Sequence, residues 1–443
     1  MSFELRKSTQ FQIQELTIVT KGGDIDISGI YEEINIFDSM FVPVMNGKIL
    51  IKDSIGLFGK LLFDGSETLL IEVVKDPNSE IANFKKAFRI HRQSDRKKTD
   101  GGEMYTLHFV SDELIYSEQK KITQSFSGTY SYIVQKIMEN YLKLPDNQLG
   151  GVYEETVGIR DVSLPNMKPL EAIEWIAKRC VDANQAPNYV FFQNLTGYNF
   201  ASLSKLLTQP ELLDIKFDPK NTTGSNPFQE ISSARAFEVV SQADNYQKTK
   251  LGINAGSFVG FDPMSGITAT KKISFGDVYD SMKHANETPE FSEIFDRDGK
   301  PNTQQFDAKK TVSFFDSAMK QSKYVQDSDP ESTSKFENIE DWLFQRKAII
   351  ANLMLKRLKI AMPGNFQLTS GFNVNVMAPT QGKKEDGDEN DDPSLSGKYI
   401  IVASRHIIGY DKHETVIEVA TTSTNNDFIP SGNPEQAKQI LDY

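Results

Sequence analysis

The side chains best suited to bind a metal ion lie in an acidic run toward the C-terminus. They stand at alternate positions, as the first ligands of a calcium loop do: Asp386, Asp388, Asn390 and Asp392. The sixth position is Asp391, where the sharp turn of such a loop needs glycine, and the twelfth is Gly397, where a bidentate glutamate is needed. Because blocks of like charge are usually solvated, the run predicts an exposed hairpin loop over 383–392, with calcium binding as the alternative.

The histidines and the cysteine form no motif for a metal ion or a nucleophile. No two histidines stand four residues apart, and no His-Glu-x-x-His occurs among His91, His108, His284, His406 and His413. His91, His108 and His406 fall in strand patterns, which favours a place in a wall or an interface. The single cysteine, Cys180, excludes an internal disulfide and a multi-cysteine zinc site. It lies on the apolar stripe of a predicted helix, so we expect a buried structural thiol.

Two pairs of carboxylates could supply an acid and a base for cutting a polysaccharide: Asp53 with Glu67, and Glu171 with Glu174. The second pair follows Pro169, a favoured first helical residue, where acidic side chains simply complement the helix dipole. The sequence contains no glycine-rich phosphate loop and no Gly-x-Ser-x-Gly elbow. We therefore expect a non-enzymatic protein, without catalytic, cofactor-binding or metal-binding residues.

Composition limits the partners of this 443-residue chain, whose length suggests two to four domains. Its 61 acidic and 49 basic residues give a net charge of −12, which argues against binding nucleic acid through phosphate neutralisation. The charge is compatible with a wall past which DNA slides without sticking. The N-terminus lacks an apolar signal region and no long apolar stretch occurs, so we expect folding in a cytoplasm and no membrane insertion.

The elements that must position these residues change character along the chain. Residues 1–116 are dominated by alternating strands, which suggests a barrel or sandwich. Residues 117–225 read as a mixed α/β unit, with helices in "TYSYIVQKIMENYLK" and after Pro169, and a hairpin in "YVFFQNLTGYNF" turned at 196–197.

The second half is predicted to return to strands. Strands in 226–275 and 336–426 are expected to form a second β domain, interrupted by a polar insertion over 276–335 and followed by a tail over 427–443. A buried helix is predicted from Asp341 to the Pro363-Gly364 stop, and "GKYIIVASRHIIGYDKHETVIEVATT" predicts two strands joined at 409–412. The predicted fold class is α+β and β-rich.

One stretch, "EEINIFDSMFVPVMNGKILIKDSIGLFGKLLFDGSETLLIEV", resembles the opening domain of baseplate hub proteins from contractile-tailed bacteriophages. The matching residues are Gly47, Ile49, Ile51, Asp53, Gly65, Glu67, Thr68 and Leu69. "SLPNMKPLEAIEWIAKRC" with "YVFFQNLTGYNFASLSKL" is similar to the middle domain of that family. "MPGNFQLTSGFNVNVMAP" and "LSGKYIIVASRHII" are similar to its second β domain. The hub half of type VI secretion spikes is a relative, and the resemblance leaves out 276–335.

The resemblance implies two tube-like antiparallel β-barrel domains with an α/β middle domain and an extended insertion. It also implies a homotrimeric ring that matches a sixfold tail tube, provides the DNA channel and carries a trimeric spike. The other expected partners are the tail tube protein or a tube-initiator ring, a tape measure protein and further baseplate proteins. DNA would pass an acidic lumen without specific binding. The expected location is the virion tail baseplate, after assembly in the host cytoplasm.

Two alternative functions stay open at this point: the hub of a phage-derived contractile injection machine, and a tail-associated peptidoglycan hydrolase. Two structural expectations follow from the hub reading. The β domains should have the same strand order, because a trimer matches a sixfold tube only if each chain supplies two equivalent docking surfaces. The acidic loop and the 276–335 arm should project from the ring, the arm being ordered by a neighbour through Phe291, Ile294, Phe295, Phe306, Phe314, Phe315 and Tyr324.

Overall fold

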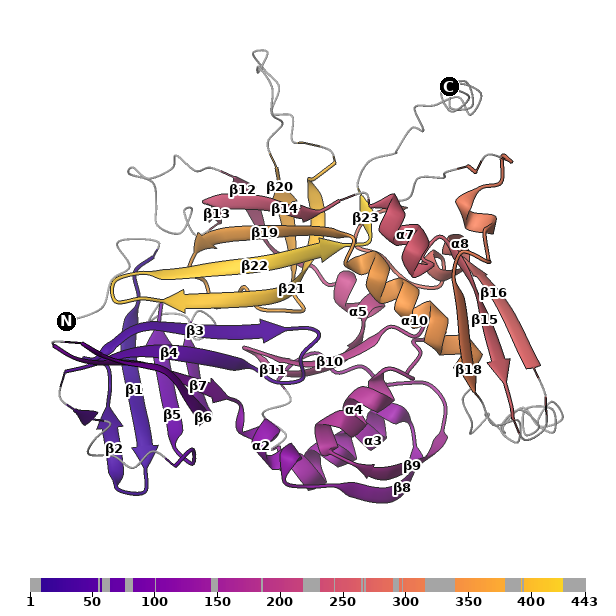
Figure 1. Cartoon of the computed structure of the whole chain (residues 1–443). Coiled ribbons are helices and arrows are strands. Elements are labelled where there is room, and N and C mark those ends of the chain that lie inside the picture. Colours follow the sequence, from indigo (N-terminus) through magenta and orange to yellow (C-terminus); the bar gives the residue numbers. More distant parts are fainter. Residues whose placement is uncertain are drawn as a thin grey trace, which may run out of the picture.

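The computed structural model describes most of the chain as β-sheets, with the helices toward the bottom and the right of Figure 1. The described residues are 9–54, 56–57, 64–75, 83–99, 101–144, 150–184, 186–217, 232–242, 244–263, 266, 268–289, 295–296, 298–314, 339–378, 392 and 394–424. Within these ranges, no helix is both long enough and apolar enough to span a membrane.

The first barrel is built from the N-terminal strands, whose alternating apolar residues face a common core. Its strands are β1 (Gln12–Thr20), β2 (Gly23–Asp26), β3 (Tyr31–Ser39), β4 (Asn46–Asp53), β5 (Thr68–Val74), β6 (Phe84–Thr99) and β7 (Gly102–Val110). They pair antiparallel in the order β3-β4-β7-β6-β5-β1-β2. The alternation places Ile49, Ile51, Leu69 and Ile71 in the core, as the period of two predicts.

The second barrel uses strands from two distant parts of the chain. They are β12 (Glu211–Phe217), β13 (Ser233–Ala234), β14 (Ala236–Ser241), β19 (Lys356–Pro363), β20 (Asn373–Met377), β21 (Gly397–Ile408) and β22 (His413–Thr421). β14 pairs with β19, while β13 just before it pairs with β12. The Arg235 N–H between them donates to the Ala361 carbonyl at 2.8 Å. The kinked β13–β14 segment therefore closes the barrel around Leu358, Ile360, Val374, Val376 and Ile401.

The two barrels are fused into one 14-stranded sheet. β3 pairs antiparallel with β21, with Ile34 opposite Ile408 and Ser39 opposite Ala403. Figure 1 shows these strands, indigo and yellow, side by side between the two barrels. We call the β3–β21 contact the seam.

A mixed α/β unit lies below the barrels in Figure 1. It contains α2 (Asp112–Glu118), β8 (Ile122–Gly128), α3 (Tyr130–Ile137), the π-helical turn η1 (Met138–Leu142), β9 (Arg160–Met167), α4 (Pro169–Ala177), β10 (Tyr189–Asn194), β11 (Gly197–Ser202) and α5 (Leu203–Leu207). The predicted helical stripes meet in its core through Ile133, Ile137, Ile173, Ile176 and Cys180. The β10–β11 turn falls at 195–196, one residue before the predicted position.

A smaller unit is inserted into the second barrel and lies at the right of Figure 1. It contains α7 (Asn245–Leu251), β15 (Ala255–Phe261), β16 (Thr268–Ser274), α8 (Phe275–Tyr279), the 3-10 turn η3 (Asn302–Gln304), β18 (Lys310–Phe314) and α10 (Ile339–Leu353). β15 pairs with β16 and, in parallel, with β18. The short β17 (Thr288–Pro289) pairs instead with β23 (Ser423–Thr424), directly after the last barrel strand.

The structure confirms the β-rich α+β class with two barrels, a mixed middle unit and an insertion. It differs from the sequence reading in three places. β12 joins the second barrel, although 117–225 was read as the middle unit, and β15 and β16 leave that barrel for a sheet with β18. The predicted helix from Asp341 to Pro363 ends at Leu353, because Leu358, Ile360 and Met362 turn inward on strand β19, where β14 and β22 supply pairing.

Candidate functional site

The two barrels have the same strand order. With the short strands β2 and β13 left aside, the first barrel has β1, β3, β4, β5, β6 and β7 in chain order, and the second has β12, β14, β19, β20, β21 and β22. In both, the order around the sheet is first, fourth, fifth, sixth, third and second. One difference is the direction of the first strand, because β1 runs antiparallel to β5 whereas β12 runs parallel to β20.

The fifth strands, β6 and β21, also share an irregularity. Each is paired with the fourth strand at its beginning and with the sixth strand afterwards, and the change occurs at Arg89 in β6 and at Ile400 in β21. A register shift follows in both strands, just after Ile90 and just after Ile401. A β-bulge at the same place in both barrels makes the likeness more specific than strand order alone.

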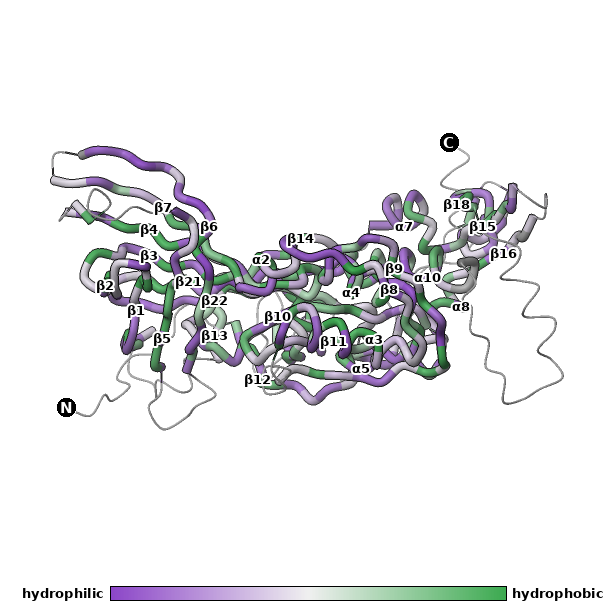
Figure 2. Tube along the Cα trace, turned by 90° about the horizontal axis from the view of Figure 1, so that it is seen from below, coloured by the Kyte–Doolittle hydropathy of each residue, from purple (hydrophilic) through white to green (hydrophobic). Residues whose placement is uncertain are grey.

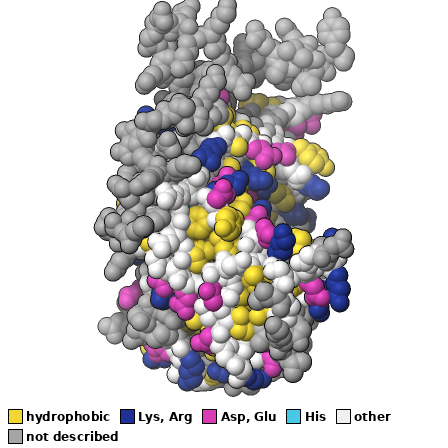
Figure 3. Space-filling model, turned by 90° about the vertical axis from the view of Figure 1, so that its left-hand side faces the viewer, with side chains coloured by type: hydrophobic (Ala, Val, Ile, Leu, Met, Phe, Trp, Pro, Cys, Tyr) yellow, Lys and Arg dark blue, Asp and Glu magenta, His cyan; other side chains and the backbone are white. Residues whose placement is uncertain are grey.

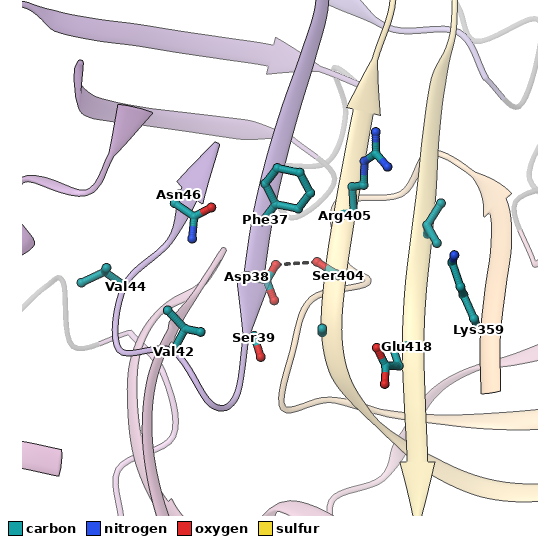
Figure 4. A pocket seen from close by; sticks show the side chains of 12 residues that line it. Phe37, Asp38, Ser39, Val42, Val44, Asn46, Lys359, Ser404, Arg405 and Glu418 are labelled. Carbon is teal, nitrogen blue, oxygen red and sulfur yellow. Dashed lines mark hydrogen bonds between the residues drawn. The ribbon is translucent and has the colours of Figure 1, made fainter. Parts of the chain in front are cut away.

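Asp38 of β3 is a buried acid at the seam (Figure 4). Its carboxylate accepts hydrogen bonds from Ser404 Oγ at 2.5 Å, Thr369 Oγ1 at 3.1 Å and the Ser370 N–H at 2.7 Å. Burial raises the pKa of Asp38, and the hydrogen bonds, that of Ser370 first, oppose the rise. Because the three donors belong to β21 and to the loop after β19, a single carboxylate of the first barrel holds two parts of the second.

Two buried histidines lie at the same seam. His406 Nδ1 and His413 Nε2 are 3.3 Å apart, and both rings pack on Phe366, at 5.1 and 4.4 Å between ring centres. Burial lowers the pKa of His406 to about 3. Burial, then the neighbouring His406 and Lys75, hold the pKa of His413 well below its usual range. The pair is therefore a neutral, aromatic part of the core and not a proton shuttle at neutral pH.

The seam borders a pocket of about 470 Å³, which Figure 4 shows from close by. Charged side chains from three strands, Lys359, Arg405 and Glu418, stand along one side of it, and Val42 and Val44 along the other. Across the described residues, no group of three or more His, Cys, Asp or Glu side chains could hold a metal ion. The pocket lies where the barrels meet, so its shape depends on the seam.

The middle unit supports the seam from below. At the tip of the β10–β11 hairpin, Asn194 Nδ2 donates to the Ser370 carbonyl at 2.7 Å, and the Leu195 N–H donates to Thr369 Oγ1 at 3.1 Å. Gly371 is required beside these residues, because its φ is +89° and an added Cβ would lie 2.6 Å from the Phe192 ring. The loop that binds Asp38 is thus held from both sides.

The residues singled out from the sequence do not converge on a reaction centre. Glu67 accepts hydrogen bonds from the Asp64 and Gly65 N–H groups and so fixes a turn, while Glu171 accepts weakly from the N–H of Lys168 at the start of α4. Cys180 is buried, as expected, and its thiol donates to the Ile176 carbonyl at 3.3 Å.

The remaining histidines have local partners. His108 Nε2 is 2.8 Å from Ser94 Oγ, and the rings of His91 and His108 are 6.3 Å apart. His284 stacks on Tyr279 at 3.6 Å and lies 2.8 Å from Thr422 Oγ1.

Most of the candidate calcium loop and of the insertion anchors lies outside the described residues. Of the loop, Asp392 is described, and its carboxylate accepts from the N–H and Oγ of Ser394 in a local turn. Phe291, Ile294, Phe315 and Tyr324 fall outside. Phe314 is 71% exposed and Phe295 42% exposed, so the expectation that a neighbour covers them stays a prediction.

The charged residues of the first barrel alternate in sign across its outer face. Lys85 pairs with Glu72 at 2.5 Å, and Arg96 pairs with Glu103 at 2.6 Å. Figure 3 shows basic and acidic side chains interspersed around apolar patches on this side of the molecule. This face is mixed in charge, and the acidic lumen expected from the net charge stays a prediction.

Sequence reasoning missed Asp38 and the histidine pair. The signal for Asp38 was present: it follows Ile34 and Ile36 at steps of two, so it had to face the same side as two core residues. The same spacing places His406 two residues before the buried Ile408.

The chain is similar to known proteins in its structure. No protein-family model matches the sequence, and no curated protein matches it. The chain is similar to a tail protein from Neisseria meningitidis MC58, at 10% identity and a TM-score of 0.51, over 93% of this chain and 96% of that one. The 43 kDa tail protein of prophage MuSo2 from Shewanella oneidensis follows at 10% identity and a TM-score of 0.48, over 92% and 97%.

A type VI secretion system component from E. coli is more distant, at 8% identity and a TM-score of 0.39, over 95% of this chain and 79% of that one. At such identities the likeness to the Neisseria meningitidis protein establishes a shared fold. The chain therefore shares its fold with that tail protein.

Proposed function

We propose that this chain is the central hub of a contractile-tail baseplate. Three copies form a ring that joins the tail tube to a spike and leaves a channel for DNA. The observation that carries the proposal is the pair of barrels with one strand order and one bulge position, fused in a single chain. Three such chains present six equivalent barrels, which suits a threefold spike on one side and a sixfold tube on the other.

The fold shared with a tail protein supports the same role. The proposed partners are two further copies of the chain, a trimeric spike protein, the tail tube protein or a tube-initiator ring, a tape measure protein and neighbouring baseplate proteins. The proposed location is the baseplate of the virion tail, and DNA passes through the ring without sequence-specific binding.

The test is the mass and shape of the purified full-length chain. Light scattering coupled to size exclusion, alone and with the spike protein, should give three times the mass of one chain. Negative-stain images should show rings with six lobes around a central hole. A monomer under every condition, with the spike protein included, would refute the proposal.

A zymogram separates the hub from a wall-degrading tail enzyme. The purified chain should leave a peptidoglycan gel uncleared, while a lysozyme lane clears it. Reproducible clearing by the chain would favour the enzyme.

A further inference from the structure

Two equivalent strand edges differ in this chain: one is paired with a further strand, and its counterpart in the other barrel is not, among the described strands. The second strand of the first barrel, β3, has β4 on one side and β21 on the other. Its counterpart β14 has β19 on one side, and among the described strands none pairs with its other side. Likewise, the fifth strand β21 is covered by β3 beyond its bulge, whereas β6 beyond Ile90 pairs with β7 alone in the described part of the chain.

The registers relate the two edges through the third and sixth strands, although β6 has a second register shift, between Ser94 and Lys97, that β21 lacks. Two rows of directly paired residues cross the second, third, sixth and fifth strands: Ile36, Gly47, Phe109 and Ile90 in the first barrel, and Val239, Leu358, Val419 and Ile401 in the second. Val239 is therefore the counterpart of Ile36, and Glu238 that of Asn35.

The counterparts in β14 are more exposed than the residues of β3, as expected for a strand with no described neighbour on that side. Ile36 is fully buried and Asn35 is 2% exposed, because β21 covers them. Val239 is 41% exposed, and Glu238 is exposed as well. Exposed edge strands are ready to pair with another chain unless something covers them.

We propose that β14 of one chain adds antiparallel to the outer half of β6 of a second copy, which repeats the seam between chains. At the seam, Asn35 lies opposite Ile407. The counterpart of Ile407 in β6 is found by counting along the sixth strands, in which Val419 of β22 corresponds to Phe109 of β7. Ile407 pairs with Glu414, five residues before Val419, and Lys97 pairs with Met104, five residues before Phe109. Lys97 is thus the counterpart of Ile407. The new pairing therefore places Glu238 of one copy opposite Lys97 of the next.

The charges and the shape of the two edges suit each other. Glu238 and Lys97 are opposite in sign, and such cross-strand pairs stabilise a sheet. The β6 strand is rich in basic residues, which are Lys85, Lys86, Arg89, Arg92, Arg96, Lys97 and Lys98. Figure 2 shows the β6–β7 hairpin extending from the barrel as a largely hydrophilic arm. The contact is head-to-tail, so repetition gives a ring when the rotation from one copy to the next closes, and an open filament otherwise. That the ring closes at three copies rests on the proposed function.

Cross-linking tests the pairing in the full-length chain. The variant Glu238→Cys/Lys97→Cys, treated with an oxidant or with a short bis-maleimide, should give covalent dimers and trimers on a denaturing gel. The matched control is Val312→Cys/Lys97→Cys, which moves one thiol to another exposed strand position, 65% exposed, and should give monomers. Cys180 is buried and does not compete in the native state.

Charge reversal is the second test. Glu238→Lys and Lys97→Glu should each raise the dissociation constant of the assembly by roughly two- to fivefold per interface. The combined variant should return it toward that of the unmodified chain. A merely destabilised fold would not be rescued by the second reversal.

The outcomes separate this inference from the proposed function. Rings without cross-links, and without rescue, would overturn the β14–β6 pairing while leaving the hub intact. Absence of any assembly would overturn both. Cross-linked open chains in place of closed trimers would support the pairing and refute the trimeric ring.

Discussion

Acidification should weaken the seam through its two buried histidines. In the folded chain both imidazoles are held neutral, with the pKa of His406 lowered to about 3 and that of His413 held well below its usual range by burial and then by His406 and Lys75. In the unfolded chain each has an ordinary pKa of about 6.5. Below that pH the unfolded state binds protons that the folded state does not, so the free energy of unfolding falls as the pH falls.

The size of this effect follows from the linkage relation. Between about pH 7.5 and pH 5.5, one histidine that stays neutral in the folded state contributes a loss of about 1.4 kcal/mol, and two contribute about 2.7 kcal/mol. Asp38 acts in the opposite sense, because burial raises its pKa and lower pH favours the folded state. The three other histidines, which also have lowered pKa values, add to the loss. The pH dependence of the free energy of unfolding is therefore the sum of contributions from several titrating groups.

A comparison of variants isolates the pair. Urea unfolding followed by circular dichroism should be measured at both pH values for the unmodified chain, for His406→Gln and for His413→Gln. Each variant is expected to lose about 1.4 kcal/mol less than the unmodified chain on acidification. His284→Gln should also reduce the acid loss, since burial lowers the pKa of His284, and it measures what a histidine outside the seam contributes. Equal acid losses in the unmodified chain and both seam variants would refute the argument that the pair stays neutral.

Three other properties can be checked independently. Asp38→Ala leaves three hydrogen-bond donors without their acceptor and should lower the free energy of unfolding by roughly 3 kcal/mol in urea, with Asp38→Asn retaining part of it. Gly47→Ala should fail to give soluble protein, since its Cβ would lie 2.4 Å from a β3 carbonyl oxygen, whereas Gly29→Ala meets nothing within 4 Å and should melt normally. Cys180 should react with a thiol reagent only after denaturation, and reaction in the native state would contradict its burial. Deleting 384–391 should leave assembly intact by light scattering, and loss of assembly would show that this loop is structural.

Elements whose partners lie close in sequence could be predicted well. The β21–β22 hairpin was expected from alternation on both sides of the 409–412 turn, and the structure has strands at 397–408 and 413–421. The helix beginning at Tyr130 was visible from its apolar stripe, and Pro169 marked the start of α4. In each case the local period and the local turn residues are sufficient.

Elements that depend on distant partners were assigned wrongly. The residues of β19 follow α10 without a strong helix breaker, so the sequence "LMLKRLKI" continued the helical pattern. Its strand form is decided by pairing with β14 and β22, and no local signal reports that pairing. The same holds for β12, whose neighbour β20 begins at Asn373, far along the chain.

One side of the seam could be predicted from the sequence, and the other could not. Steps of two from Ile34 and Ile36 mark Asp38 as an inward carboxylate, which needs hydrogen-bond donors when buried. Those donors, however, come from residues more than 330 positions away, so their identity could not be derived from local pattern. The neutral histidine pair depends in the same way on Phe366, in the loop between β19 and β20.

The seam can form only late in the synthesis of the chain. Ser404, which closes on Asp38, is made 366 residues after it. At ordinary rates of synthesis that interval lasts roughly 20 to 70 s, and for most of it the strands of the first barrel are complete while β3 has no partner on its outer side. A nascent chain with an uncovered strand edge is prone to pair with other nascent chains. We therefore expect the first barrel to be prone to association with other chains until the last barrel strands emerge, and a truncation after Val110 to accumulate as aggregates.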